Sequence, residues 1–373
     1  MKIAVYAIAK NESANAEAWA ENLADADGIF VLDTGSTDDT IALLRASGVT
    51  VNQISNAKKF RFDKARNEAM HHVPKDYDVL VSLDFDERLS PGWREVIEQQ
   101  FDENTDVANY TLVYGFDNEG RITTSYPRSA VHRHNSATWQ CAVHELLIPL
   151  KDKPKKTLEF LCVHYGQAKP AGHYLELLKL NREERPNDPR ALGYLAREYY
   201  GMGNYTMARP LYQDYIRIET YPPMQSEACL RVAHMSPDFV SQEWWMRQAV
   251  QLCDNMREPY CELANLYFRN QMWEHCIAYV KSAMRYKKPD YDTIYTDAFY
   301  SDTWAYHMLM AAYQQDGNYR KAIHAQEQLL ASFEDGNIPN DVTQDIMVLQ
   351  RAVNEVYYAY RDSVRGTGSK EKE

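Results

Sequence analysis

Short apolar runs alternate with helix-forming sequence along the first hundred residues of the chain. The apolar runs lie at Ile3–Ala9, Gly28–Leu32, Val49–Ile54 and Val79–Leu83, and the helix-forming stretches lie at Ala14–Ala24, Ile41–Ala46 and Phe62–His72. Continuous apolar strands are typical of a parallel sheet that is buried on both faces. Strands that alternate with helices at short spacing place those helices on the two faces of such a sheet. The pattern therefore predicts an α/β domain.

From Val107 onward the pattern favours strands without intervening helices. Ala108–Phe116 and residues 121–127 flank a turn at Asp117–Gly120, which is typical of a β-hairpin. Thr138–Leu150 and Thr157–Gln167 are two further strand-like runs, and each contains a histidine.

The second half of the chain is almost entirely helix-forming, and it contains a repeat. The apolar set that begins at Leu195 returns at Leu263, an offset of 68 residues or twice 34, and again at Leu309, which is 46 residues further. The last offset is one unit of 34 residues with an insertion of 12, which we place at Pro289–Phe299. Thirty-four residues is the tetratricopeptide period, so the spacing favours helix-pair repeats over a generic helical bundle.

The length of 373 residues exceeds one ordinary hydrophobic core and predicts two domains. We expect the α/β domain to cover residues 1–168 and the all-α tetratricopeptide-like domain to cover residues 169–362. The polar residues 363–373 are expected to be disordered.

Charge and cysteine content narrow the class of protein. The net charge of −12 gives no overall attraction to nucleic acid or to an anionic membrane. The six cysteines show no C-x-x-C pairing, which predicts reduced thiols and a cytoplasmic location. We expect no signal peptide at the N-terminus and no membrane span, because no apolar stretch reaches the roughly 18 to 20 residues that a bilayer requires.

Two aspartates, Asp84 and Asp86, follow the apolar run Val79–Leu83. Open α/β sheets bind their ligands at the carboxyl ends of their strands. Residues i and i+2 of an extended chain point to the same side, so both carboxylates can face one site. Such a pair suits Mg²⁺ or Mn²⁺ shared with a diphosphate. A solvated acidic turn is the alternative interpretation, because the Asp-x-Asp spacing is short and common.

Further polar residues interrupt or follow the other apolar runs. Asp33 can accept a hydrogen bond from a nucleotide base or a ribose, or it can cap a helix. Arg66 can reach a diphosphate or form a surface ion pair. His164 can bind Mn²⁺ or Zn²⁺, although a lone histidine is more often structural. The pair His144-Glu145 offers a carboxylate that can act as a general base.

Six blocks of the first half, in this order, resemble family 2 glycosyltransferases of the GT-A fold. The blocks are Ile8–Glu12, Val31–Thr40, Phe62–Ala69, Ser82–Trp93, Val131–Glu145 and Cys162–Gly166. Each block alone is weak, and the six together are specific. The second half resembles the tetratricopeptide-type helical region that follows such domains in some glycosyltransferases. The resemblance therefore implies a Rossmann-like domain with a mixed, mainly parallel sheet, followed by an all-α domain.

The resemblance also implies roles for individual residues. The nucleotide pocket would be lined by Ala9, Asn11, Glu12 and Asp33, with Asp33 toward the base. Arg66 would lie near the diphosphate, and Asp84 would face the ribose and the metal. Asp86 would be the main ligand of Mn²⁺ or Mg²⁺, and His164 would complete the metal site. Glu145 would be the catalytic base, with His144 beside the acceptor or the donor sugar.

The activity implied by the resemblance is a metal-dependent, inverting transfer of a sugar from a nucleotide-sugar donor, which we expect to be UDP-linked. The acceptor would be a glycan, a protein or a modified base of phage DNA. The repeats would bind the acceptor or form a homodimer. The alternatives are a catalytically silent scaffold that binds proteins through its repeats and a nucleotidyltransferase. A nucleotidyltransferase would require a glycine-rich basic loop after the first strand, and the sequence there has none.

Overall fold

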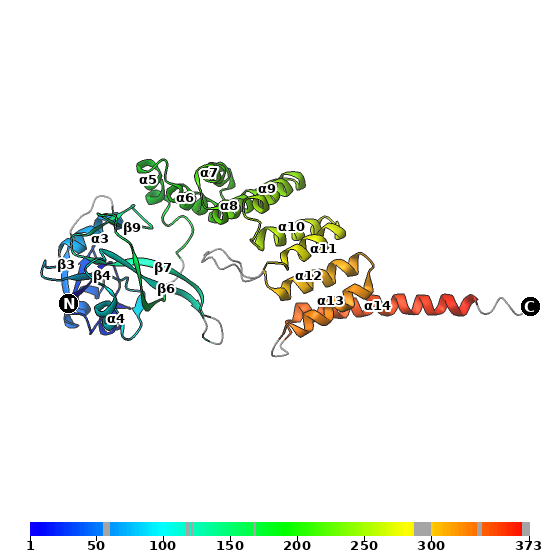
Figure 1. Ribbon diagram of the computed structural model, residues 1–373, viewed down its shortest axis with the longest axis horizontal. Coiled ribbons are helices and arrows are strands. Elements are labelled where there is room, and N and C mark those ends of the chain that lie inside the picture. The colour runs from blue at the N-terminus through cyan, green and yellow to red at the C-terminus, as the bar shows by residue number, and fades with distance from the viewer. Residues whose placement is uncertain are drawn as a thin grey trace, which may run out of the picture. The chain divides into compact units, whose positions relative to one another are not determined.

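The computed structural model describes residues 1–54, 60–116, 120, 122–166, 169–286, 300–333 and 338–367, the last of these without side chains from 357 onward. The chain forms two compact units, Met1–Asn204 and Tyr205–Glu373 (Figure 1). The first unit extends beyond residue 168, because it includes two helices, α5 (Leu175–Glu184) and α6 (Pro189–Gly201).

A mixed sheet of eight strands within the described residues forms the centre of the first unit. Its strands are β1 (Ile3–Ala9), β2 (Gly28–Asp33), β3 (Thr50–Gln53), β4 (Val79–Ser82), β5 (Glu87–Leu89), β6 (Val107–Phe116), β7 (Ile122–Arg133) and β10 (Lys156–His164). They lie in the order β3-β2-β1-β4-β7-β6-β10-β5. The first four are mutually parallel, and β7 runs antiparallel to both β4 and β6. The predicted α/β class and the predicted hairpin are confirmed, and residues 117–119 of its turn lie outside the described residues.

Helices cover both faces of the parallel part of the sheet. Successive residues of β1 point to opposite faces, as they do in any strand. On one face, Ile3 and Val5 pack in a core with residues of α1 (Ala16–Asn22), α2 (Thr40–Ala46) and α4 (Trp93–Gln100). On the other face, Ala4 and Tyr6 pack against α3 (Phe62–His71). Because β1, β2 and β4 are parallel, their carboxyl ends lie at the same edge of the sheet.

The run Thr138–Leu150, expected as one strand, is two short antiparallel strands, β8 (Ala137–Gln140) and β9 (Leu146–Pro149). The connection between them contains Cys141 and His144, which both have positive φ, at 80° and 51°. A left-handed backbone cannot continue a strand. The prediction of one strand was therefore wrong, and the connection is a loop that ends at Glu145.

The second unit consists entirely of helices within the residues that the structure describes. They are α7 (Tyr205–Ile218), α8 (Pro222–His234), α9 (Phe239–Leu252), α10 (Glu258–Arg269), α11 (Trp273–Ala283), α12 (Asp302–Gln315), α13 (Tyr319–Ala331) and α14 (Asn340–Thr367). The repeated apolar residues are buried, including Leu263 in α10 and Leu309 in α12. The proposed insertion at Pro289–Phe299 lies outside the described residues. The all-α, tetratricopeptide-like class of this half is confirmed.

The same turn recurs at the equivalent position of three repeats. Gly203, Gln271 and Gly317 have φ of 71°, 59° and 76°, and they are separated by the sequence offsets of 68 and 46 residues. The next backbone N–H in each turn donates to a tyrosine carbonyl of the preceding helix, at 2.9, 2.9 and 2.8 Å. A left-handed residue that closes a helix in this way is the usual C-terminal cap. Gln271 occupies the position that glycine occupies in the other two turns.

Other predictions about the whole chain can be compared with the structure. All six cysteines are buried free thiols, as predicted. None of the described helices is both long enough and apolar enough to span a bilayer.

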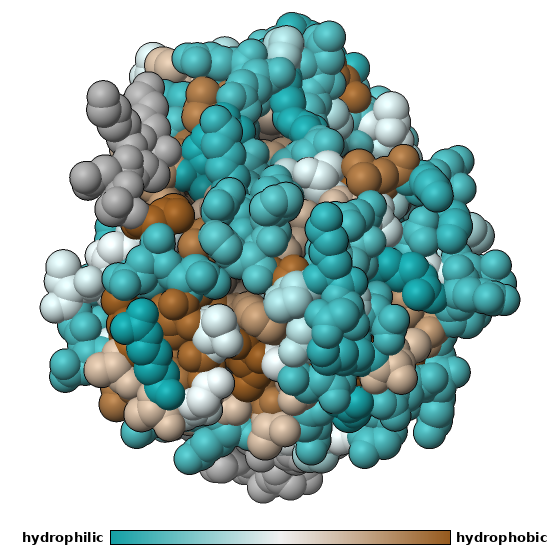
Figure 2. Space-filling view, turned by 90° about the vertical axis from the view of Figure 1, so that its left-hand side faces the viewer, coloured by the Kyte–Doolittle hydropathy of each residue, from teal (hydrophilic) through white to brown (hydrophobic). Residues whose placement is uncertain are grey.

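Figure 2 views the molecule from the left-hand side of Figure 1. Hydrophilic residues cover most of that face, and hydrophobic residues gather in its lower left part. Helix α14 continues to Thr367, which is past residue 362, the expected end of the helical domain.

Candidate active site

Asp84 and Asp86 follow β4, but they do not lie on an extended strand. The strand ends at Ser82, and the N–H of Glu87 donates to the carbonyl of Asp84 at 3.1 Å, which closes a turn. The two carboxylates consequently have different partners: Asp84 contacts two arginines, and Asp86 contacts His164. The expectation that both side chains point to one side of a strand was wrong, because a turn rather than an extended chain separates them.

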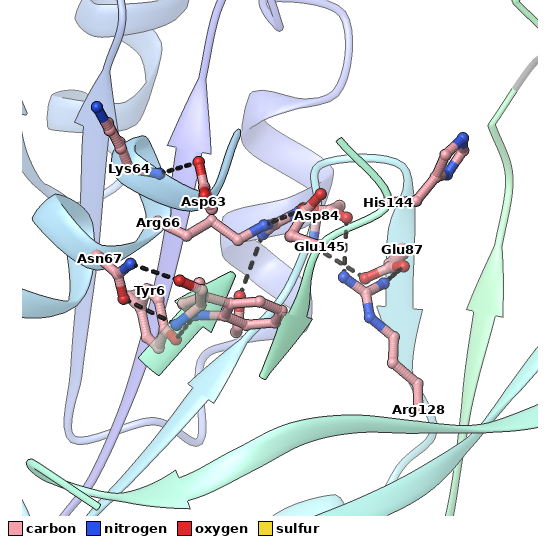
Figure 3. Close-up of polar contacts among 12 residues, drawn as sticks. Tyr6, Asp63, Lys64, Arg66, Asn67, Asp84, Glu87, Arg128, His144 and Glu145 are labelled. Carbon is pink, nitrogen blue, oxygen red and sulfur yellow. Dashed lines mark hydrogen bonds and ion pairs between the residues drawn. The ribbon is translucent and has the colours of Figure 1, made fainter. Parts of the chain in front are cut away.

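A chain of five alternating charges runs through the site. We call Glu87, Arg128, Asp84, Arg66 and Glu145, in that order, the ion chain (Figure 3). Arg128 binds Glu87 and the Oδ2 atom of Asp84, at 3.0 Å from the latter. Arg66 binds the Oδ1 atom of Asp84 at 2.7 Å and the Oε1 atom of Glu145 at 2.5 Å. The ion chain therefore connects β5, β7, the end of β4, α3 and the loop before β9.

Burial and the neighbouring arginines act in opposite directions on the pKa values of Asp84 and Glu87. Burial by itself raises the pKa of Asp84, but the positive charges of Arg66 and Arg128 outweigh it and hold the pKa well below its usual value. Burial raises the pKa of Glu87, against the attraction of Arg128. The Asp84 carboxylate is therefore negatively charged at neutral pH.

Asp86 and His164 form a second, more exposed pair. The Oδ2 atom of Asp86 lies 3.3 Å from Nε2 of His164, and the side chains are 38% and 21% exposed. The hydrogen bond to Asp86 raises the pKa of His164. A Cβ atom placed on Gly166 would lie 2.3 Å from Oδ2 of Asp86 and 2.4 Å from Cε1 of His164, so the glycine leaves room for both side chains.

The Asp86–His164 pair fits a divalent cation in its chemistry. Carboxylate oxygen and imidazole nitrogen are both ligands of Mn²⁺, and Mg²⁺ takes the oxygen. Within the described part of the chain, no group of three or more acidic, histidine or cysteine side chains could hold a metal ion. The protein itself thus offers two ligands, and a bound diphosphate would have to contribute others.

The ends of β1 and β2 are joined by hydrogen bonds into one surface. The carbonyl of Ala9 accepts a bond from the N–H of Thr34 at 2.8 Å. Asn11, whose φ is 57°, donates its N–H to Ser36 Oγ at 2.8 Å. The N–H of Glu12 donates to Thr40 Oγ1 at 2.7 Å. These bonds bring Ala9, Asn11 and Glu12 next to the loop that follows Asp33.

Asp33 ends β2 and is only 1% exposed. Its Oδ1 atom accepts two backbone hydrogen bonds, from Gly35 and Ser36, both at 3.0 Å. Its Oδ2 atom is buried and has no hydrogen-bond partner in the described structure. A buried carboxylate oxygen without a partner is unusual, because desolvation of such an atom is costly. The atom is available to a donor group of a ligand.

The electrostatics of Glu12 link this surface to the end of β4. Burial raises the pKa of Glu12, and the negative charges of Asp86 and Asp84 act in the same direction. The structure thus brings together the predicted residues of the first strand and the aspartates of the fourth. The carboxyl ends of neighbouring parallel strands converge in this way in open α/β sheets.

Two asparagines fix the backbone of the loop that carries Glu145. Asn67, in α3, donates to the carbonyl of Trp139 at 2.8 Å and accepts from its N–H at 2.9 Å. Asn181, in α5, accepts from the N–H of Ala142 at 2.6 Å and donates to the carbonyl of Val143 at 2.9 Å. Hydrogen bonds from α3 and from α5 therefore fix the position of the loop.

His144 is adjacent to Glu145 in sequence but points away from the ion chain (Figure 3). Its ring stacks on Tyr194 of α6, with 4.1 Å between ring centroids and an interplanar angle of 14°. The guanidinium of Arg190 lies 5.2 Å from the centroid of the same tyrosine ring. Partial burial, together with the positive charges of Arg190 and Arg197, lowers the pKa of His144. His144 is therefore an uncharged residue of the loop at neutral pH.

Sequence reasoning missed Arg128, Glu87, Asn181 and Tyr194. Arg128 had one usable signal, since an arginine inside a strand that joins the centre of a sheet needs a buried acidic partner. The contacts of Asn181 and Tyr194 had none, because they join residues 38 to 50 positions apart through tertiary packing alone.

Residues 5–158 match the model of the family described as glycosyl transferase family 2. Among solved structures, MamA is 16% identical, with a TM-score of 0.36, over 43% of this chain and 87% of that chain. Pseudomonas aeruginosa pilF is 11% identical, with a TM-score of 0.36, over 46% of this chain and 72% of that one. Glucosyl-3-phosphoglycerate synthase from Mycobacterium tuberculosis, in complex with Mg²⁺ and uridine diphosphate, is 25% identical, with a TM-score of 0.26, over 33% of this chain and 46% of that one.

The family match covers the residues from β1 into β10, including the whole ion chain and Asp33. It ends before His164 and before α5. Residues 5–158 of this chain belong to glycosyl transferase family 2, and an all-helical, tetratricopeptide-like region follows this enzyme domain.

Proposed function

We propose that the protein is a metal-dependent, inverting glycosyltransferase that moves a sugar from a UDP-linked donor to an acceptor hydroxyl. The family supports nucleotide-sugar-dependent transfer. The identity of the nucleotide, the use of a metal and the inverting mechanism are inferences from the residues of the site.

The observation that carries the proposal is the buried Oδ2 atom of Asp33, which lacks a partner among the described residues. The backbone of Gly35 and Ser36 fixes the carboxylate through Oδ1 only. The free oxygen can accept a hydrogen bond from a base that presents an N–H group, as uracil does at its N3 position. A cytosine ring presents an acceptor there, so Asp33 favours a uridine nucleotide over a cytidine nucleotide.

The pair Asp86 and His164 would hold Mn²⁺ or Mg²⁺ together with the diphosphate of the donor. When bound, the cation would neutralise charge on the departing nucleoside diphosphate. The absence of a side chain at Gly166 leaves room for both of these ligands.

Glu145 is the group we assign as general base. Its side chain is 11% exposed, and its Oε1 atom is bonded to Arg66. The other oxygen, Oε2, is the atom that would take the proton from the acceptor hydroxyl as that oxygen attacks the sugar. A single displacement of this kind inverts the configuration of the sugar. His144, stacked on Tyr194, would border the acceptor and not take the proton.

The test is a thermal-shift panel of UDP, GDP, CMP and ADP, each with and without Mn²⁺, on the wild type and on Asp86→Ala. A ligand that binds the folded state raises the melting temperature by mass action. We expect a metal-dependent shift with UDP that is lost in Asp86→Ala while the unliganded melting temperature is kept. Absence of a shift with every nucleotide would refute the donor site and leave a protein-binding scaffold as the function. A shift with another nucleotide would refute the assignment of uridine.

A further inference from the structure

The guanidinium of Arg66 is fully engaged inside the protein. Its three nitrogen atoms contact Glu145 Oε1 at 2.5 Å, Asp84 Oδ1 at 2.7 Å and Ser82 Oγ at 3.2 Å. The residue is 4% exposed, and its guanidinium carbon lies 5.2 Å from the centroid of the Trp139 ring. An arginine that binds a diphosphate must turn its planar edge toward that ligand. Here both carboxylates occupy that edge.

Asp84 is held just as completely. Its Oδ1 atom accepts from Arg66 and its Oδ2 atom accepts from Arg128, so each oxygen already has a charged donor. Arg128 is in turn bonded to Glu87, which is 1% exposed. Glu87 also accepts the backbone N–H of Asp84 through Oε2 at 2.9 Å. The position of Asp84 is thus determined by two arginines and by a buried glutamate behind it.

Each charge in the ion chain is neutralised by its neighbours. Moving one of these side chains away would therefore leave an opposite charge without its partner. Movement of Arg66 toward a bound diphosphate would leave the carboxylates of Asp84 and Glu145, which are 30% and 11% exposed, without its charge. Removal of one partner from a buried ion pair is far more costly than the pair itself is stabilising. A contact between Arg66 and the donor would therefore add little to the binding free energy. The arrangement favours an Arg66 that keeps its contacts with Asp84 and Glu145.

We infer that Arg66 and Arg128 are positioning residues, which hold Glu145 in place through Asp84, and that neither binds the diphosphate of the donor. The role of Glu145 in this inference rests on the proposed function. The ion chain then connects the edge strand β5 and the interior strand β7 of the sheet to the loop before β9.

This assignment replaces the expectation that Arg66 lies against the nucleotide or its diphosphate. It also gives Asp84 a different role from Asp86. Asp84 becomes the central carboxylate of the ion chain, and Asp86 with His164 is left to face the donor.

The test separates binding of the diphosphate from chemistry. Affinities for uridine and for UDP, both with Mn²⁺, are measured by calorimetry on the wild type, Arg66→Lys and Arg128→Lys. Lysine keeps the charge but cannot bridge two carboxylates with fixed geometry. We expect both variants to bind uridine and UDP within about twofold of the wild type. Loss of UDP affinity by about tenfold or more in Arg66→Lys, with uridine affinity kept, would overturn the inference.

The second readout is hydrolysis of a UDP-sugar, with water in place of the acceptor, in a panel of UDP-glucose, UDP-galactose and UDP-N-acetylglucosamine. We expect kcat to fall at least tenfold in both variants with KM unchanged, because only the base has been displaced. Unchanged kcat in both variants would also overturn the inference. If no sugar in the panel is hydrolysed, the binding measurements decide.

Two controls make the outcome unambiguous. Arg133→Lys lies in the same strand, β7, and its side chain contacts the carbonyls of Thr105 and Asp102 instead of the ion chain. This variant should match the wild type in both readouts. If Arg66→Lys does not fold, as judged by its unfolding transition, Arg128→Lys carries the test. Failure of the wild type to bind any uridine nucleotide would refute the proposed function instead, so the two failures are distinguishable.

Discussion

Asn181 accepts a hydrogen bond of 2.6 Å from the backbone N–H of Ala142, and the two residues are 39 positions apart. The same side chain donates to the carbonyl of Val143, and it is 4% exposed. A helix that follows the family 2 match in sequence thereby fixes the loop that ends at Glu145. The proposed base is thus positioned both by the ion chain and by α5.

Replacement of Asn181 by leucine should destabilise the first unit and reduce turnover. Two buried backbone groups lose their partners, and each unsatisfied group costs about 1–3 kcal/mol. The midpoint of urea unfolding and the rate of UDP-sugar hydrolysis are the measurements. Glu176→Leu is the matched control, because Glu176 lies in the same helix with an exposed side chain; it should match the wild type. Equal effects of the two variants would contradict this assignment of the two bonds.

Replacement of Asp33 by asparagine should change nucleotide preference as well as affinity. The amide oxygen can still accept from Gly35 and Ser36, so an NH₂ group takes the place of the free Oδ2 atom. This NH₂ group would face the N3–H of uracil, so that two hydrogen-bond donors meet. It can instead donate to the N3 acceptor of cytosine. We expect UDP affinity to fall by about tenfold, about 1.4 kcal/mol, and CDP affinity to rise relative to UDP. Calorimetry with the two diphosphates checks this, and a parallel loss for both would argue against contact with the base.

A methyl group at Gly166 should remove metal binding without unfolding the protein. The added Cβ would come within 2.3 Å of Asp86 Oδ2 and 2.4 Å of the His164 ring, so the pair would have to separate. We expect Gly166→Ala to lose the Mn²⁺-dependent part of the UDP thermal shift and to keep its melting temperature. Gly201→Ala is the matched control, because its Cβ would make only an ordinary contact of 3.8 Å with Ala171. Retention of Mn²⁺ binding in Gly166→Ala would exclude the pair as the metal site.

His132 should make the stability of the protein depend on pH. It lies fully buried, and its Nε2 atom is 3.0 Å from the hydroxyl of Tyr6, which itself accepts from Trp139 at 2.7 Å. Its Nδ1 atom is 2.9 Å from the carbonyl of Arg133, so these partners fit the neutral ring with the proton on Nδ1. Burial lowers the pKa of His132 from 6.5 to about 4.

A histidine whose pKa is lowered on folding binds more protons in the unfolded state between these two values. Stability is therefore intact above pH 6.5 and is lost as the pH falls toward 4, by up to about 3 kcal/mol. Urea unfolding of wild type and His132→Gln at several pH values between 6.5 and 4 measures this, and the variant should show a shallower slope. His324→Gln, at an exposed histidine, should keep the slope of the wild type. Identical slopes for His132→Gln and wild type would contradict the assignment.

The strands of the parallel sheet could be predicted closely because their apolar pattern has local causes. The structure places β1 at Ile3–Ala9 and β2 at Gly28–Asp33, as the apolar runs predicted. Each strand is buried by helices on both faces, so nearly every residue in it must be apolar. The proposed 34-residue spacing also had a local cause, since each helix pair buries the same positions.

The geometry after β4 could not be predicted in the same way. Whether Asp84 continues a strand depends on the turn that Glu87 closes, and a backbone hydrogen bond leaves no mark in the sequence. The loop before Glu145 is similar, because its left-handed residues are Cys141 and His144 rather than glycines. Arg66 was identified as a site residue, but its partners required the tertiary structure. The roles of the named site residues stay predictions until the variants are measured.

The position of α5 also sets a lower limit on the length of an active polypeptide. A chain that stopped at residue 168 would keep every residue that we assign to the donor, the metal and the base. It would still lack Asn181, and it would lack Glu184, whose carboxylate binds Arg61 directly before α3. Such a truncated enzyme should bind nucleotide and yet turn over poorly, and a version that extends through Asn204 should recover. We therefore expect the smallest active piece of this protein to extend beyond the residues that match the family.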